Sequence, residues 1–569
     1  MKKLLLILFS LLFTTILTAQ WDLTWKMTEN IFQPPQSGSN SNVVRAGFDT
    51  DNDGKGEFIT AFCEQDSNFV MMYEATGDDT YELVWSWMFP PYLHNSFNGI
   101  AVGDVDGNGL DEIFITLATQ VGDANAPRLW IFEWNGVEGE NKYGNYTTGV
   151  CEPNGTWDYG LDDGIDFRPK SLMVEDIDND GVNELITGNR GTPDSNDGKR
   201  EIIVANFSGT FTSFGNWNIE YRTADTGGAL YSVTTGDLDG DGKKEIHSLL
   251  WDLFTLRIYE ATGPDTYELQ SEIVEMDPNI DYGGWDCVGV ADVNNDGTNE
   301  MYIAGMVDSE TNFTLFAIQG EADNSTIDAS DVNKLMEFSY PKPFQSGFRN
   351  LQICDPDEDG NINLMITGHR NGLIHDIEYK GNGGDPMDST SWDASTAFDI
   401  FALYAAETGV TRETAVDSLS PRLYFGSYGG DMDGDGKNEY VFVNYSTDFD
   451  TWANDAYVWI IEAGTALAIS PGDNSNLSHF TLNQNYPNPF NPQTNIAYSL
   501  KEADFITIII YDMLGKKVRT LTNEYKIAGN HSIIWDGLTD NGSLAASGLY
   551  LYKLRTNDTQ ISKSMSLVR

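Results

Sequence analysis

Residues 237–245 read Asp-Leu-Asp-Gly-Asp-Gly-Lys-Lys-Glu, and the chain contains seven copies of this nine-residue pattern. We number them loop one to loop seven in chain order. They read DTDNDGKGE from Asp49, DVDGNGLDE from Asp104, DIDNDGVNE from Asp176, DLDGDGKKE from Asp237, DVNNDGTNE from Asp292, DPDEDGNIN from Asp355 and DMDGDGKNE from Asp431. Oxygen-bearing side chains occupy positions 1, 3, 5 and 9, and glycine occupies position 6, where it permits a sharp turn. Because Ca²⁺ prefers six to eight oxygen ligands, the spacing predicts a calcium site in each loop.

The predicted calcium ligands are the side chains at positions 1, 3, 5 and 9. In loops one to four they are Asp49, Asp51, Asp53, Glu57, Asp104, Asp106, Asn108, Glu112, Asp176, Asp178, Asp180, Glu184, Asp237, Asp239, Asp241 and Glu245. In loops five to seven they are Asp292, Asn294, Asp296, Glu300, Asp355, Asp357, Asp359, Asn363, Asp431, Asp433, Asp435 and Glu439. We expect weaker sites where asparagine replaces a carboxylate, above all in loop six.

A single copy of such a run could be an ordinary surface turn, because Asp, Asn and Gly are common in turns. Carboxylates that converge without a cation, however, repel one another by several kcal/mol at an intermediate dielectric constant. The loops are also unlike EF-hands, which need a glutamate at position 12. Position 12 is here Thr60, Ile115, Thr187, Ser248, Ile303, Ile366 and Phe442. Strand-like runs follow the loops, so we predict metal loops within β-hairpins.

The repeat unit predicts a β-propeller. The loops begin 55, 72, 61, 55, 63 and 76 residues apart, a spacing typical of four-stranded propeller blades. Two copies of one strand pair are nearly identical, YEATGDDTYELVW from Tyr73 and YEATGPDTYEL from Tyr259. Seven units of four strands indicate an all-β, seven-bladed β-propeller. Only two strands are predicted after loop seven, so we expect residues 21–27 to complete the last blade and close the ring.

The D-x-D-x-D-G-x-x-E loops within four-strand repeats resemble the FG-GAP/VCBS family, the calcium-binding repeat also found in integrin α-chains. The resemblance covers roughly residues 21–464 and implies up to seven structural Ca²⁺ ions. We place the propeller at residues 20–464 and a linker, which contains PGDNSNLS, at residues 465–479.

Residues 480–569 alternate short strands with turn residues, which predicts a small immunoglobulin-like β-sandwich. Four strings in this segment, NYPNPFN from Asn485, IYDMLG from Ile510, WDG from Trp535 and SGLY from Ser547, closely resemble the type A C-terminal sorting domain of the type IX secretion system. The resemblance implies a Bacteroidetes-like source, the secretion machinery as a partner, and export across the outer membrane. An ordinary immunoglobulin-like module is the alternative.

The N-terminus predicts export from the cytoplasm. Lys2 and Lys3 precede an apolar run and small residues that end at Ala19, so residues 1–19 are interpreted as a signal peptide. No later run is long enough for a membrane span. We therefore expect a secreted or surface-attached protein that reaches the outside through the periplasm.

The net charge of −54 excludes a general nucleic-acid binder, which would need a basic face. Of the 87 acidic residues, 25 occupy predicted ligand positions, so the remaining acids form a charged surface that resists aggregation. The pairing of Cys63, Cys151, Cys287 and Cys354 stays open, and buried thiols are equally compatible with the sequence.

Two insertions interrupt the repeats, at about residues 135–167 and residues 381–419, the second with one expected short helix. Their function stays open, because insertions often extend a binding face but can also be structural.

Ligands of propellers commonly bind where the innermost strands begin. There the sequence places Asn98, Lys170, Tyr231, Asp286 and Arg349, with Phe97, Trp285 and Phe348 one position before three of these. These residues would suit a sugar or a peptide, but we favour the alternative that the aromatic side chains pack between blades and the polar groups meet solvent.

No histidine or serine motif of a known enzyme class occurs in the sequence. We therefore favour a non-catalytic protein that binds an extracellular glycan or protein, for example in adhesion. The alternatives are a propeller-type polysaccharide lyase or glycoside hydrolase, whose two carboxylates could be hidden among the many acids, and a structural surface component.

Overall fold

The computed structural model describes residues 20–27, 40–64, 67–90, 98–117, 127–162, 165, 167–191, 200–211, 215–224, 226–280, 282–306, 312–340, 347–368, 370–381, 383–464, 480–482, 485, 490–500, 504–512, 516–526, 529–539, 543–555 and 560–568. The chain divides into two compact units, Met1–Leu467 and Ala468–Arg569. The predicted signal peptide and linker lie outside the described residues.

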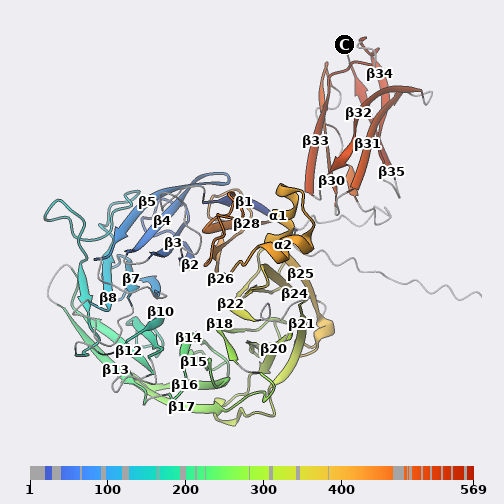
Figure 1. Cartoon of the computed structure of the whole chain (residues 1–569). Helices are drawn as coiled ribbons and strands as arrows, with labels where there is room; N and C mark the ends of the chain where they lie inside the picture. Colours follow the sequence, from blue (N-terminus) through green and yellow to red (C-terminus); the bar gives the residue numbers. More distant parts are fainter. Residues whose placement is uncertain are drawn as a thin grey trace, which may run out of the picture. The chain divides into compact units, whose positions relative to one another are not determined.

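The first unit is a seven-bladed β-propeller, as predicted (Figure 1). Blade one contains β2 (Asn40–Phe48), β3 (Glu57–Glu64), β4 (Ser67–Gly77) and β5 (Thr80–Met88). Blade two contains β6 (Ile100–Gly103), β7 (Glu112–Thr116), β8 (Leu129–Glu133) and β9 (Gly155–Trp157). Blade three contains β10 (Pro169–Glu175), β11 (Glu184–Asn189), β12 (Glu201–Ser208) and β13 (Asn216–Arg222). Blade four contains β14 (Leu230–Gly236), β15 (Glu245–Leu250), β16 (Thr255–Gly263) and β17 (Thr266–Ile273).

The remaining blades repeat this order. Blade five contains β18 (Tyr282–Ala291), β19 (Glu300–Met306), β20 (Asn312–Gln319) and β21 (Asn333–Ser339). Blade six contains β22 (Phe348–Cys354), β23 (Asn363–Gly368), β24 (Leu373–Tyr379) and β25 (Trp392–Asp399). Blade seven contains β26 (Leu423–Gly430), β27 (Glu439–Asn444), β28 (Val458–Gly464) and, at its outer edge, β1 (Gln20–Lys26). A single parallel bridge between Asp286 and Asn350 joins the sheets of blades five and six.

The described residues of each blade's second strand are buried, because neighbouring blades cover both of its faces. All six residues of β15 are buried, for example, and so are all five of β7. One core cluster contains Ile59 and Trp85 of blade one together with Ile113 and Phe132 of blade two. Burial on both faces explains why the run after each metal loop reads as continuous apolar sequence.

The ring closes through the N-terminal strand. β1 pairs antiparallel with β28, with Gln20 opposite Gly464 and Lys26 opposite Trp459. The Trp25 ring makes edge-to-face contacts with three rings of blade one, Phe58, Tyr73 and Tyr81, at centroid distances of 5.7–5.8 Å. The first strand of the chain therefore completes blade seven and also packs against blade one.

Both insertions differ from the expectation, because each contains the fourth strand of its own blade. β9 lies in the first insertion, and β25 lies in the second. The second insertion also forms two helices where one was expected, α1 (Ile400–Thr408) and α2 (Arg412–Ser418). Short 3₁₀ turns occur at Asn324–Thr326 and Ser389–Ser391.

Cys151, Cys287 and Cys354 form no disulfide within the described part of the chain, and the Cys63 side chain lies outside the description. Among the described helices, none is both long and apolar enough to cross a membrane.

The second unit is the predicted small β-sandwich. One sheet has the order β29 (Phe480–Leu482), β30 (Thr494–Leu500), β33 (Gly529–Trp535). The other has the order β32 (Lys517–Lys526), β31 (Asp504–Asp512), β34 (Gly548–Arg555), β35 (Gln560–Leu567). Its core packs Ile508, Trp535 and Tyr552, all fully buried.

Replacing Trp25 tests ring closure. We expect Trp25→Ala to lower the free energy of unfolding by about 3 kcal/mol, because it removes three aromatic contacts between the first strand and blade one. Leu23→Ala on the same strand is the control, since Leu23 is 38% exposed. Equal stabilities of the two variants in urea unfolding would contradict this role of the strand.

Candidate metal loops and the opposite face

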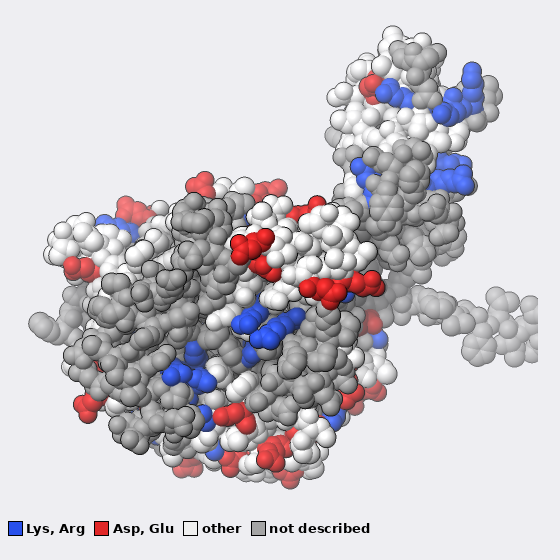
Figure 2. Space-filling model, viewed as in Figure 1, with Lys and Arg blue, Asp and Glu red and all other residues white. Residues whose placement is uncertain are grey.

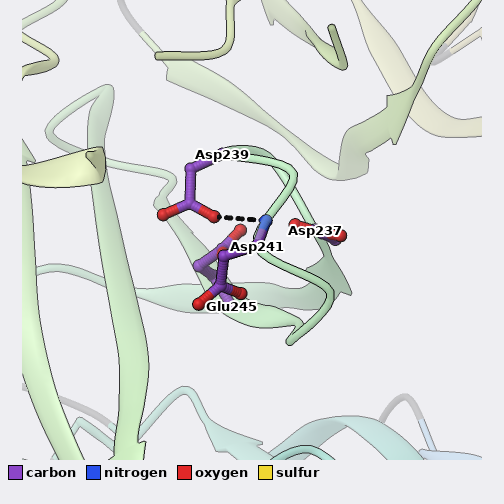
Figure 3. A group of neighbouring side chains, drawn as sticks. All are labelled: Asp237, Asp239, Asp241 and Glu245. Carbon is purple, nitrogen blue, oxygen red and sulfur yellow. Dashed lines mark hydrogen bonds between the residues drawn. The ribbon is translucent and has the colours of Figure 1, made fainter. Parts of the chain in front are cut away.

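Each predicted metal loop connects the innermost strand of a blade to the second strand. In loop four, which joins β14 to β15, one oxygen from each of Asp237, Asp239, Asp241 and Glu245 lies within 4.8 Å of the others (Figure 3). The equivalent four residues of loop seven, Asp431, Asp433, Asp435 and Glu439, are gathered in the same way. The structure therefore brings together the side chains that the sequence pattern selected.

Local hydrogen bonds hold the first six positions in one shape. In all seven loops the glycine N–H at position 6 donates to the carboxylate at position 1, over 2.8–3.1 Å. The side-chain oxygen at position 5 accepts from the N–H at position 7, over 2.8–2.9 Å. The position-6 glycines have φ between 85° and 91°, a conformation that L-residues rarely adopt. These contacts explain why glycine is present in every copy.

The glutamate at position 9 uses only one of its two oxygens within the protein. In every loop except loop six, its Oε2 accepts from the backbone N–H at position 2, over 2.6–3.4 Å. Its other oxygen, Oε1, is buried and has no hydrogen-bond donor among the described residues in five loops, at Glu57, Glu112, Glu245, Glu300 and Glu439. A buried carboxylate oxygen without a partner is costly unless a cation or a proton is bound to it.

Loop six reaches a similar arrangement with different residues. Position 2 is Pro356, which has no N–H to donate, and position 9 is Asn363. The Asn363 Nδ2 donates to Asp376 over 2.7 Å, while its Oδ1 is buried and has no donor among the described residues. Asn363 therefore still provides one unpartnered oxygen, as the glutamates do.

Burial raises the pKa of the position-9 carboxyls Glu57, Glu112, Glu184, Glu300 and Glu439 above the usual 4.5. The backbone N–H at position 2 opposes the rise, and neighbouring loop carboxylates add to it. The pKa is raised to about 8 at Glu57, to about 9 at Glu112, Glu184 and Glu439, and to about 7 at Glu300. Without a cation, the groups with a pKa of about 8 to 9 favour the protonated form at neutral pH.

Sequence reasoning missed the acids on the third strand of four blades. The residue opposite position 9 is Glu74 in blade one, Glu133 in blade two, Glu378 in blade six and Glu462 in blade seven. Lys55 at position 7 of loop one bridges Asp53 and Glu74, and Lys437 of loop seven bridges Asp435 and Glu462. The repeated glutamate of YEATG, present at Glu74 and Glu260, was the signal for these acids.

The metal loops also join neighbouring blades. The position-3 carboxylate accepts a backbone N–H from the next blade in three loops: from Asp79 at Asp433, from Phe211 at Asp106 and from Asp265 at Asp178, over 2.6–2.8 Å. In a fourth, the Asn324 amide donates to Asp239 over 3.1 Å. A change in the geometry of one of these loops would therefore also alter its hydrogen bond to the next blade.

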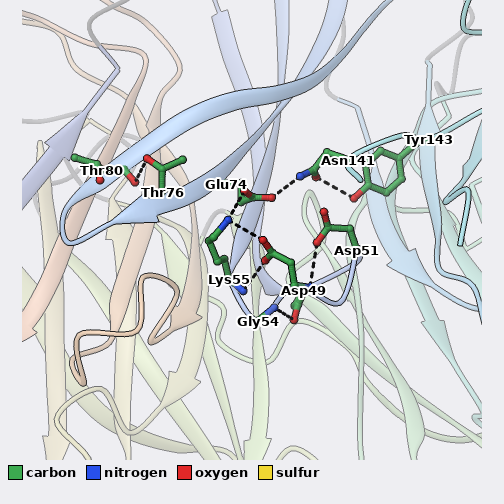
Figure 4. A network of polar contacts seen from close by, with 10 residues as sticks. Asp49, Asp51, Gly54, Lys55, Glu74, Thr76, Thr80, Asn141 and Tyr143 are labelled. Atoms are coloured by element: carbon green, nitrogen blue, oxygen red, sulfur yellow. Dashed lines mark hydrogen bonds and ion pairs between the residues drawn. The ribbon is translucent and has the colours of Figure 1, made fainter. Parts of the chain in front are cut away.

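The first insertion covers loop one (Figure 4). The Gly139 N–H donates to the Asp51 carbonyl over 3.0 Å, Asn141 donates to Glu74, and the Tyr143 hydroxyl contacts the Thr50 hydroxyl. Tyr143 is fully buried. These contacts give the insertion a structural role at the boundary of blades one and two.

The opposite end of the ring holds the other residues selected from the sequence. Asn98 is buried and donates to the Thr116 carbonyl over 2.8 Å, and Phe348 is fully buried between blades, so both are structural. Tyr231 and Lys170 are half-buried, and Arg349 is 4% exposed. Phe97 and the side chains of Trp285 and Asp286 lie outside the description.

Two family models match parts of the chain. An FG-GAP-like repeat matches residues 49–115, which include loops one and two, and a FlgD Ig-like domain matches residues 490–560. No curated protein matches the chain.

Several solved structures resemble the chain at low sequence identity. PorZ, a surface component of the type IX secretion system of Porphyromonas gingivalis, is 12% identical with a TM-score of 0.36, over 92% of this chain and 59% of that chain. The Nup133 β-propeller of Vanderwaltozyma polyspora is 9% identical with a TM-score of 0.39, over 79% and 98%. Rhamnogalacturonan lyase PL11 of Bacillus licheniformis is 13% identical with a TM-score of 0.39, over 79% and 76%. The chain thus spans about three-fifths of the PorZ chain, and no function follows from likenesses at this level.

The raised pKa values predict how the metal-free protein depends on pH. Because the folded pKa lies above the unfolded value of 4.5, the contribution of these glutamates to stability is fully present below about pH 4.5 and is lost as the pH rises through 8 to 9. In a chelator, we expect the free energy of unfolding to fall from about pH 5 to about pH 9. Urea unfolding across this range measures it, and a rise in stability with pH would contradict the burial of these carboxyls.

Proposed function

We propose that the seven loops bind structural Ca²⁺ ions and that the propeller is an extracellular binding protein for a glycan or a protein. The observation that carries the calcium assignment is the buried, unpartnered oxygen at position 9, which recurs in five loops and has an asparagine counterpart in loop six. A cation at this point would neutralise the converging carboxylates and provide the missing partner.

Calcium fits the donor set better than other common metals. The ligand positions offer only carboxylate and amide oxygens, the donors that hard cations prefer, whereas zinc and copper sites use nitrogen and sulfur. Ca²⁺ also accepts the irregular, crowded geometry of a loop more readily than Mg²⁺, which needs a near-ideal octahedron.

Bound calcium would act mainly on stability and rigidity. An ion that binds the folded loops but not the unfolded chain stabilises the fold by RT ln(1 + [L]/Kd) at each site. Because position 3 also accepts hydrogen bonds from the next blade, the ions would hold the blades in a fixed arrangement. A rigid ring is suited to presenting a binding surface on its other face.

Removing two ligands from loop four tests the metal assignment. We expect Asp239→Ala with Asp241→Ala to bind one Ca²⁺ fewer per chain, measured by elemental analysis after desalting, and to gain less thermal stability from calcium. Glu268→Gln with Glu275→Gln removes two charges from exposed positions of the same blade and serves as the control. Unchanged calcium content in the loop variant would refute a site in loop four.

We further propose that residues 480–569 direct export through the type IX secretion machinery, after the signal peptide has led the chain to the periplasm. The support is the set of sequence strings at Asn485, Ile510, Trp535 and Ser547 on a small β-sandwich at the end of the chain. The propeller would then be released or attached at the cell surface, where calcium is available.

Truncation tests the sorting role. In a host with this secretion system, we expect the chain that ends at Gly464 to accumulate in the periplasm, while the full chain reaches the surface or medium. Fusing residues 465–569 to an unrelated periplasmic reporter is the complementary experiment and should export the reporter. Immunoblotting of cell fractions measures export, and normal export of the truncated chain would disprove the proposal.

A further inference from the structure

Five arginines gather at the end of the ring opposite the metal loops. They lie where innermost strands begin or second strands end, and we call them the arginine cluster: Arg168, Arg190, Arg349, Arg370 and Arg422. Blades three, six and seven contribute them. Because the metal loops join the other ends of the same strands, the cluster and the loops occupy opposite faces of the propeller.

Aromatic rings connect these arginines. The Arg190 guanidinium lies 4.9 Å from the centroid of the Tyr231 ring, and Arg349 lies 4.9 Å from that of Tyr424. The Arg422 guanidinium lies 6.0 Å from the centroid of the same Tyr424 ring. The Tyr445 ring stacks on the Tyr424 ring, with 4.9 Å between the two centroids. Several Lys and Arg side chains are visible near the middle of the ring in Figure 2, whereas most Asp and Glu lie towards its rim.

The cluster is unusual in a chain with 87 acidic and 33 basic residues. Other propeller arginines pair with acids: Arg128 with Asp158, Arg200 with Asp252, Arg222 with Glu201, Arg257 with Glu272 and Arg412 with Asp399. No carboxylate of the described residues forms an ion pair with Arg190, Arg370 or Arg422. The Nε atoms of Arg190 and Arg370 are buried and have no acceptor within the described part of the chain.

The electrostatics of the neighbouring groups place these charges close together. Burial raises the pKa of Tyr231, and the positive charges of Arg190, Arg349 and Arg168 oppose that rise. Burial lowers the pKa of Arg349, and the positive charge of Arg370 lowers it further. Like charges gathered at buried and half-buried positions are unfavourable unless an anion neutralises them.

We propose that the arginine cluster binds an acidic oligosaccharide through the carboxylates of its uronic acid units. This inference rests on the proposed binding function and specifies its ligand. A guanidinium presents a planar fork of donors that matches a carboxylate, and the cluster contains arginine at five positions.

The aromatic residues favour a sugar over an acidic peptide. Tyr231, Trp251 and Tyr445 are half-buried at this end of the ring, and the Tyr231 and Trp251 rings meet edge to face at 5.5 Å. Such rings offer apolar surface to the C–H face of a sugar while their polar atoms hydrogen-bond its hydroxyls. Arginines from three blades also suit a ligand with several carboxylates along its length.

Binding measurements on the full mature chain at fixed free calcium test the proposal. The probes are oligogalacturonate, oligoalginate, neutral galactan oligosaccharides and a poly-glutamate peptide, studied by isothermal titration calorimetry. We expect at least one acidic oligosaccharide to bind, with an affinity that falls as salt rises. Arg190→Gln and Arg422→Gln should each weaken it about tenfold, the effect of losing one charge-assisted hydrogen bond.

Arg257→Gln is the matched control, because Arg257 pairs with Glu272 on the outer part of blade four and lies outside the cluster. It should bind as the unchanged chain does, and thermal unfolding checks that all three variants fold. Equal binding by the cluster variants, or preference for galactan or poly-glutamate, would overturn the acidic-sugar inference while the binding function stands. Failure of the unchanged chain to bind any probe would overturn both.

Discussion

The convergence of carboxylates in each nine-residue loop is the constraint on which the rest of the propeller depends. Three or four acidic groups are held within a few ångströms by a glycine turn and by backbone N–H donors at positions 2, 6 and 7. These hydrogen bonds satisfy only part of the available oxygens, and in five loops the position-9 carboxyl keeps one buried oxygen without a donor among the described residues. The mutual repulsion and the desolvation both favour a bound cation or a bound proton.

The same loops form the joints between blades, so local electrostatics and global architecture are coupled. Backbone donors of blades one, three and four reach the position-3 carboxylates of the preceding blades. The ring is closed separately by β1, whose Trp21 donates to Asp376 over 2.7 Å, the carboxylate that also receives the Asn363 amide of loop six. Loop six therefore lacks both the position-2 N–H and the position-9 carboxylate, because these positions are Pro356 and Asn363. Its Asn363 instead shares the Asp376 carboxylate with Trp21 of blade seven.

Charge is divided between the two ends of the propeller. The metal loops concentrate acids at one end, while arginines surround tyrosines at the other. Under the proposed functions, this division would separate a structural task, holding the blades, from a recognition task at the centre of the ring. It would also allow a chain with a net charge of −54 to offer a basic surface to the proposed anionic ligand.

The sequence alone determined the seven loops, the strand after each loop and therefore the number of blades. The contacts that shape a loop, such as Gly242 to Asp237, span five residues and follow from local turn geometry. The sequence also indicated a β-sandwich after residue 479. The pattern of residues 21–27 predicted the outer strand of blade seven. Only the tertiary structure decided that Glu74 and Glu378 face the loops, that fourth strands lie within both insertions, and that five arginines meet at the centre. Those outcomes depend on strand register and on the meeting of blades far apart in the chain, which no nine-residue pattern specifies.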